Sequence, residues 1–151
     1  MREAIQAGGA DVQALCLYFS ILNSVLHIIE SFLSQEELPD FYEENLPAIA
    51  ETLVFVIQSN FSSMGKTPAE VVKCKAKAVR VIYIYQFKFS EFTQNYAQWF
   101  FQEVWSMVLG SQVQASKQNE RLIHAVIRYL TEMIFNFSYH EFFKSNLATL
   151  F

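Results

Sequence analysis

The sequence has few cysteines and histidines, which limits its covalent and metal chemistry. Its 2 cysteines, Cys16 and Cys74, are far apart and have no second pair. Such cysteines do not build the disulfide framework of a small secreted protein and are typical of reduced thiols in the cytosol or nucleus. The 3 histidines add no pair at the short spacings that let neighbouring side chains share a metal ion. We therefore expect no metal site and two thiols packed in a core.

The chain also lacks an excess of basic residues. It has 15 acidic and 11 basic side chains, a formal charge of -4 and a pI near 5.3. No overall positive field is therefore available to hold a phosphate backbone, and we expect no nucleic-acid partner. Hydrophobic residues make up 52% of the sequence, which is too apolar for disorder and enough for one domain with a sizeable core.

Catalytic motifs are missing as well. Gly65-Lys66-Thr67, at the start of a predicted helix, imitates the end of a phosphate-binding loop, but Asn60 stands where the pattern requires a glycine. The next apolar run ends in Gln86 and not in the aspartate that would hold magnesium. No G-x-S-x-G nucleophile motif occurs. We predict no catalytic residue and no cofactor, and a nucleotide-binding enzyme of the P-loop type is only the third hypothesis.

The longest hydrophobic run, residues 14–33, raises the question of a membrane span. Asn23, His27, Glu30 and Ser31 recur in this run at helical spacing and form one polar stripe. An amphipathic helix of a soluble protein fits that stripe better than a span, so we expect no membrane partner.

Only 3 prolines and 4 glycines interrupt the chain, and most of them fall between apolar runs of helical period. We predict helices over 11–33, 40–59, 68–88, 91–109 and 118–136, with a sixth helix that begins near residue 139. Thr67 and Glu70 form the pattern of a capping box at the start of the third helix. Pro47 lacks a backbone donor, so the second helix should kink near it or restart after a short first turn.

The sequence repeats itself about every fifty residues. When Asn45, Asn95 and Asn146 are aligned, apolar residues recur three before, one after and four after the asparagine, on one helical face. Two earlier columns are also apolar: Leu33, Tyr83 and Ile134, and Phe32, Ile82 and Met133. This repetition predicts an all-α, HEAT-like αα superhelix, or solenoid, of two and a half to three helix pairs. A five- or six-helix bundle with coincidental columns is the alternative.

We place the three repeats at about 11–60, 67–110 and 117–151, in a single segment that spans 1–151. The last of them ends in apolar residues and not in the polar cap that a terminal repeat needs. We therefore expect a piece of a longer arch, whose apolar C-terminal end lets the isolated segment self-associate.

Several motifs in the chain occur together in one family. They are Leu38-Pro39-Asp40-Phe41-Tyr42-Glu43-Glu44-Asn45, then Glu91-Phe92 with Tyr96, Trp105 and Leu109, then Tyr139-His140 ahead of Phe143. In this order, from about residue 12 to the end, the chain resembles the early HEAT repeats of the importin-alpha re-exporter family, in the importin-beta karyopherin superfamily. The most specific part is L-P-[DE]-F-[FY]-[ED]-[DE]-N. After it this chain has the short connection SNFSSMGK, where family members carry a longer acidic loop.

The resemblance implies a function that the composition does not reveal. Members of this family form an arch that carries importin-alpha out of the nucleus together with Ran-GTP and releases it when GTP is hydrolysed. It therefore implies a non-catalytic scaffold that shuttles between nucleus and cytoplasm, with importin-alpha and Ran-GTP as protein partners. A HEAT-repeat scaffold of an unrelated pathway is the alternative.

Charged residues are predicted to lie on different faces of the helix pairs. Asp40, Glu44 and Glu51 follow the polar face of the second helix. Lys73, Lys77 and Arg80 form a basic strip on the third helix, with Lys66 and Lys75 nearby. Since the first helix of a HEAT pair generally lies on the convex side, the arch would be basic outside and acidic inside. We expect the acidic row to face a basic surface of a partner, against the alternative of an ordinary solvated face.

The fourth predicted helix is crowded with aromatic residues: Tyr96, Trp99, Phe100, Phe101 and Trp105. Such a helix could offer a platform for bases or for a phenylalanine-rich peptide. A helix that is hydrophobic nearly all round is more often buried, so we expect these residues to fill the core.

Overall fold

The computed structural model describes residues 11–37, 40–61, 67–110, 116–136, 139–141 and 144. Within them the chain forms α2 (Val12–Leu33), α3 (Asp40–Glu44), α4 (Leu46–Gln58), α5 (Ala69–Lys88), α6 (Ser90–Leu109) and α7 (Glu120–Phe135). The five predicted helices before residue 137 are confirmed, the second of them in two parts. Most of the sixth helix, expected from about residue 139, and the apolar C-terminal end lie outside the described residues.

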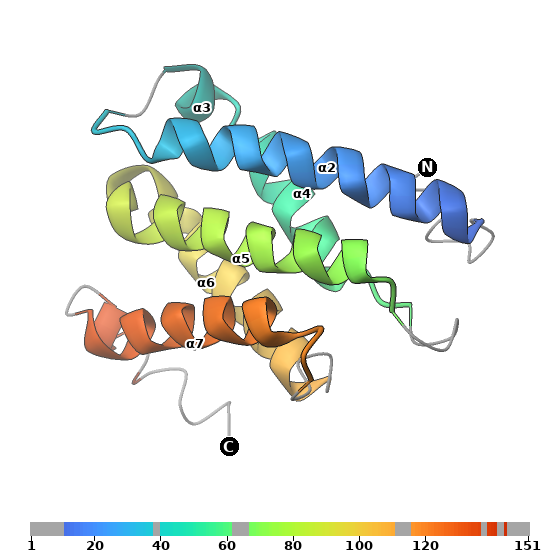
Figure 1. Ribbon diagram of the computed structural model, residues 1–151. Helices are drawn as coiled ribbons and strands as arrows, with labels where there is room; N and C mark the ends of the chain where they lie inside the picture. The colour runs from blue at the N-terminus through green and yellow to red at the C-terminus, as the bar shows by residue number, and fades with distance from the viewer. Residues whose placement is uncertain are drawn as a thin grey trace.

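The helices form two layers. In Figure 1, α2, α5 and α7 lie side by side and run in the same direction, with α4 and α6 behind them. Helix α5 contacts α2, α4, α6 and α7, and α4 contacts α6. The first helices of successive pairs therefore make one layer and the second helices make the other, which is the arrangement of an αα solenoid. The predicted all-α, HEAT-like fold is confirmed, while the division into three repeats stays a prediction.

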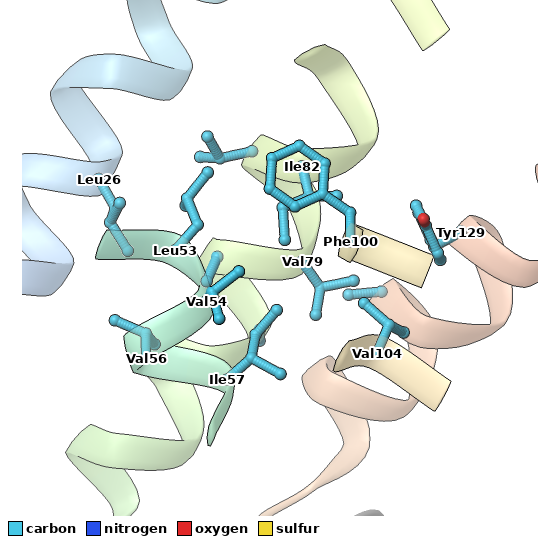
Figure 2. Packing of buried hydrophobic residues seen from close by; sticks show 14 of the residues in the cluster. Leu26, Leu53, Val54, Val56, Ile57, Val79, Ile82, Phe100, Val104 and Tyr129 are labelled. Atoms are coloured by element: carbon cyan, nitrogen blue, oxygen red, sulfur yellow. The ribbon is translucent and has the colours of Figure 1, made fainter. Parts of the chain in front are cut away.

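The hydrophobic core lies between these layers and centres on α5. Val79 and Ile82 of α5 lie among Leu53 and Val54 of α4 and Phe100 of α6 (Figure 2). Each of these side chains is buried, and burial of one such side chain contributes about 1.5–3 kcal/mol. The apolar period of the sequence is thus explained by contact between the two layers.

The second helix is interrupted at Asn45, as the position of Pro47 predicts. Helix α3 ends at Glu44 and α4 begins at Leu46, with Pro47 in its first turn. Asn45 fills the gap: its backbone N–H and its side-chain Nδ2 both donate to the carbonyl of Phe41, at 3.1 and 2.8 Å. Because proline has no N–H and crowds the carbonyl four residues earlier, the chain restarts as a new helix.

The predicted capping box at the start of α5 is wrong. Pro68, with φ -58° and ψ 144°, occupies the N-cap position, and no side chain caps the helix. Its carbonyl accepts hydrogen bonds from the N–H groups of Val71 and Val72, at 3.1 and 3.3 Å. Thr67 is therefore one residue too early to cap. Its carbonyl accepts a hydrogen bond from Gln118 Nε2 at 2.9 Å, which ties the start of α5 to the turn before α7.

Polar contacts fix how the first-layer helices stack. Gln86 of α5 is fully buried; its Oε1 accepts a hydrogen bond from Tyr129 Oη of α7, and its backbone carbonyl accepts one from Tyr139 Oη, both at 2.8 Å. At the other flank, Lys88 Nζ donates to the carbonyl oxygens of Leu33, at 3.0 Å, and Gln35. Lys88 thereby caps the C-terminus of α2, which has no basic residue in its own last turn.

The sequence predicted Lys75 to lie near the basic strip of Lys73, Lys77 and Arg80, but Lys75 is not part of that exposed strip. Its side chain is only 3% exposed. Burial lowers the pKa of Lys75 from its usual 10.5 to about 8, because the charged ammonium loses its hydration. The helical period of α5 sets Lys73 and Lys77 outward, and the residue midway between them points inward.

The burial of Lys75 predicts a pH-dependent stability. Because its pKa is lower in the folded chain, the unfolded chain binds more protons between about pH 8 and 10.5, and the cost of burying the charge is full below pH 8. We expect Lys75→Met to raise the free energy of unfolding at pH 7 by on the order of 2 kcal/mol. The gain should shrink as the pH rises toward 10.5.

Urea denaturation of both proteins between pH 7 and 10.5 measures this difference. Burial also raises the pKa of the neighbouring Cys74 to about 12, but that thiol is present in both proteins and leaves the difference unchanged. Lys73→Met, at an exposed position two residues away, is the matched control and should give no such pH trend. A constant difference between wild type and Lys75→Met across this range would contradict the prediction.

Candidate functional site

The predicted acidic site lies on the side of the molecule formed by α3 and α4. Asp40, Glu44 and Glu51 are all exposed. Asp40 and Glu44 are one turn apart on α3, but Glu51 belongs to α4, beyond the break at Asn45. The three carboxylates therefore do not follow one continuous helix, and their role in partner binding stays a prediction.

The predicted basic strip lies in a groove across the first layer. Lys73, Lys77 and Arg80 of α5 line a groove of about 1110 Å³ between α2 and α7. Helix α7 adds Arg121, His124 and Arg128 to the lining, and α2 adds His27 and Ile28. We call this feature the basic groove. The sequence prediction did not include the α7 cations, because the basic strip was assigned to one helix.

Glu30 holds two of the groove cations in place. This residue of α2 is buried, and its carboxylate forms ion pairs with Lys77 Nζ at 2.5 Å and Arg80 Nη2 at 2.6 Å. The two α5 side chains thus converge on one carboxylate from the neighbouring helix. A charge this deep requires such partners, since an unpaired buried carboxylate would cost several kcal/mol.

A third cation is fixed by an aromatic ring. The guanidinium of Arg128 on α7 lies over the ring of Tyr83 on α5, 4.5 Å from its centroid, a typical cation–π distance. Lys73 and Arg121 also line a smaller hollow of about 220 Å³, to which Lys117 and Glu120 contribute. In the described part of the chain, no ion pair involves Lys73, Arg121 or Arg128.

The fifty-residue period contained a signal for this groove. Applied to polar positions, this period aligns His27, Lys77 and Arg128 in one column and Asn23, Lys73 and His124 in another. All six residues line the groove. Because each helix of the first layer presents the same register position to the outside, the columns become adjacent when the pairs stack.

Four of the five aromatic residues singled out on α6 fill the core, as the sequence predicted, whereas Trp105 is half-buried and stacks on Phe101. Phe100 and Phe101 are buried, and Tyr96 and Trp99 pack against the same core. The rings of Trp99 and Phe100 are nearly parallel, with an interplanar angle of 9° and centroids 6.4 Å apart. Among the described residues, no group of three His, Cys, Asp or Glu side chains could hold a metal ion.

Helix α2 carries an apolar stripe on its outer flank. Ile21, Val25, Ile28 and Phe32 are between 42% and 57% exposed. The same repeat register gives Val71, Lys75, Ala78 and Ile82 on α5, and Leu122, Val126, Tyr129 and Met133 on α7. Every one of these equivalents is 3% exposed or less. The α2 stripe thus has the register of a stacking face.

By length and composition, α2 is also the one helix in the described ranges that could cross a membrane, with 17% of its apolar window buried. Core helices of soluble proteins pass the same test. The register equivalence explains its apolar flank by stacking, because the matching flanks of α5 and α7 are covered by helices.

Removal of the Glu30 charge tests the ion pairs that shape the groove. We expect Glu30→Gln to lower the free energy of unfolding by about 1–3 kcal/mol, because Lys77 keeps its charge in a largely buried place. The figure stays below that of a fully buried pair, since the Arg80 side chain is 57% exposed.

Chemical denaturation measures the loss against Glu51→Gln, a change at an exposed position on α4. This control should shift stability by about 0.5 kcal/mol or less. Equal losses in the two variants would mean that the ion pairs of Glu30 do not stabilise the contact between α2 and α5.

Comparison with known proteins gives one family. The family model Cse1 matches residues 1–150. Searches of curated proteins and of solved structures returned no match. The matched range takes in both layers of helices and the LPDFYEEN motif, and the family consists of transport receptors and not of enzymes. This chain belongs to the Cse1 family, the importin-alpha re-exporters, whose members act in nuclear export.

Proposed function

We propose that this chain is part of a nuclear export receptor that binds importin-alpha together with Ran-GTP and shuttles between nucleus and cytoplasm. Family membership supports a role in nuclear export. The observation that carries the finer proposal is the exposed acidic row of Asp40 and Glu44 on α3 and Glu51 on α4. A basic cargo surface would be attracted to such a row.

The two layers differ in charge, which supports this choice of face. The basic groove opens on the first layer, between α2, α5 and α7, whereas the acidic row belongs to α3 and α4. A basic partner surface would be repelled by the groove and attracted to the acidic side, so the charge pattern orients it.

Charge reversal tests the acidic row. We expect Asp40→Lys, Glu44→Lys and Glu51→Lys, combined in the complete natural protein, to weaken the capture of importin-alpha with Ran-GTP by about tenfold or more at low salt. The effect should fall as salt rises, because exposed charges are screened. Surface plasmon resonance at two salt concentrations gives both affinities.

A matched control reverses three exposed acidic residues elsewhere, Asp11, Glu91 and Glu120. It changes the net charge by the same amount and should retain most of the affinity. If the row variant keeps its affinity at low salt, or if both variants lose it equally, the acidic row is not the cargo surface.

We also propose that the stack continues beyond α2, with a further helix of HEAT type on the stripe of Ile21, Val25, Ile28 and Phe32. The support is the register: the equivalent residues of α5 and α7 are buried, and in the stack α5 contacts α2 and α7 contacts α5. An apolar stripe of this kind in a solenoid is buried by the next helix.

The consequence is a difference between the isolated chain and the complete natural protein. Ile21→Glu with Val25→Glu should change the stability of the isolated chain by about 0.5 kcal/mol or less, because both side chains are already exposed. In the complete protein the same change should cost more than about 2 kcal/mol, because two charges would be buried. Thermal melts compare the effect of the double substitution in the isolated chain and in the complete protein. Leu109→Glu, at another exposed apolar position, is the control. Equal, small effects in both proteins would leave the stripe without a covering helix.

A further inference from the structure

The basic groove is separate from the acidic row that we propose as the cargo surface, so it remains available for another partner. We propose that it binds an acidic, amphipathic helical segment of a partner protein. The proposal concerns the opposite layer and does not depend on which cargo the acidic row takes. It follows from the charge of the groove, its apolar rim and the spacing of its cations.

Positive charge is concentrated in the groove, although the chain as a whole is acidic. Five Lys and Arg side chains line it: Lys73, Lys77, Arg80, Arg121 and Arg128. The carboxylate that contacts these cations is Glu30, and it is engaged by Lys77 and Arg80. In a chain with a formal charge of -4, this is a local excess of positive charge. A cleft with low-dielectric walls focuses such a field and attracts an anionic partner.

The rim of the groove makes a peptide a better occupant than a nucleic acid. Ile127 of α7 lines the groove beside the cations and is more than half exposed. Apolar side chains of a peptide would bury this surface, which a sugar-phosphate backbone cannot do as well.

The spacing of the α5 cations suits a helical occupant. Lys73, Lys77 and Arg80 are separated by four and three residues on one face of α5, so they span about 10 Å along the helix. Carboxylates at the same spacing on a partner helix would meet them in register. Arg121 and Arg128 on α7 repeat a two-turn spacing along the facing wall.

Peptide binding to the 151-residue chain tests the proposal. The probe is a fluorescein-labelled peptide of four helical turns with glutamate on one face and leucine on the other, followed by fluorescence anisotropy. We expect saturable binding that weakens as salt increases. Lys73→Glu and Arg121→Glu should each reduce the affinity about tenfold. These two cations are chosen because they lie outside the Glu30 ion pairs, so the fold should survive the change.

Three controls decide the result. Lys144→Glu reverses one exposed charge away from the groove and should leave the affinity within about twofold of wild type. A peptide with glutamine in place of glutamate should bind at least about tenfold more weakly. An oligothymidylate of equal charge should compete more weakly than the acidic peptide. Equal losses from Lys144→Glu and the groove variants, undiminished binding of the glutamine peptide, or tighter binding of the oligonucleotide would each overturn the proposal.

Discussion

Helix α5 is covered on both flanks and from behind, and the rest of the described structure depends on that burial. It packs between α2 and α7 in its own layer and against α4 and α6 in the other. Polar and ionisable side chains are buried along α5, among them Cys74, Lys75, Tyr85 and Gln86. A buried polar side chain needs a hydrogen-bond partner or a shifted protonation state. Gln86 has its partners in Tyr129 and Tyr139, so the same contact that buries α5 also fixes the position of α7.

The sequence predicted the parts of the fold that local periodicity decides. The apolar period predicted the helices. Pro47 predicted the break between α3 and α4, because the loss of a backbone N–H affects hydrogen bonds only within one helical turn. Thr67 failed as a cap because the helix began at Ala69, one residue later than a capping box needs, and ends are the least determined part of a helix. Lys75 failed because its burial depends on neighbouring helices, which the period of α5 alone does not describe.

The candidate sites divide in the same way. The exposure of Asp40, Glu44 and Glu51 could be predicted from the polar face of one segment. The basic groove could not, because its walls come from three helices about fifty residues apart in the chain. Glu30 was assigned to a polar stripe of α2, but its role emerges only when α5 brings Lys77 and Arg80 beside it. Charges that meet across helices are visible in the sequence only after the repeat register is applied to them.

The fifty-residue repeat register separates residues that are buried between stacked helices from residues that face the groove. In the column of Ile28, Ala78 and Tyr129, the side chains on α5 and α7 are fully buried, and Tyr129 donates a hydrogen bond to Gln86 of α5, so burial in the stack explains their apolar or satisfied character. The column of His27, Lys77 and Arg128 faces the groove. The stack accounts for two of these side chains, because Lys77 pairs with Glu30 of α2 and Arg128 lies over the ring of Tyr83 on α5. Lys73 and Arg121 also line the groove but form no ion pair in the described part of the chain. The fold does not explain their positive charge, which therefore points to a binding partner.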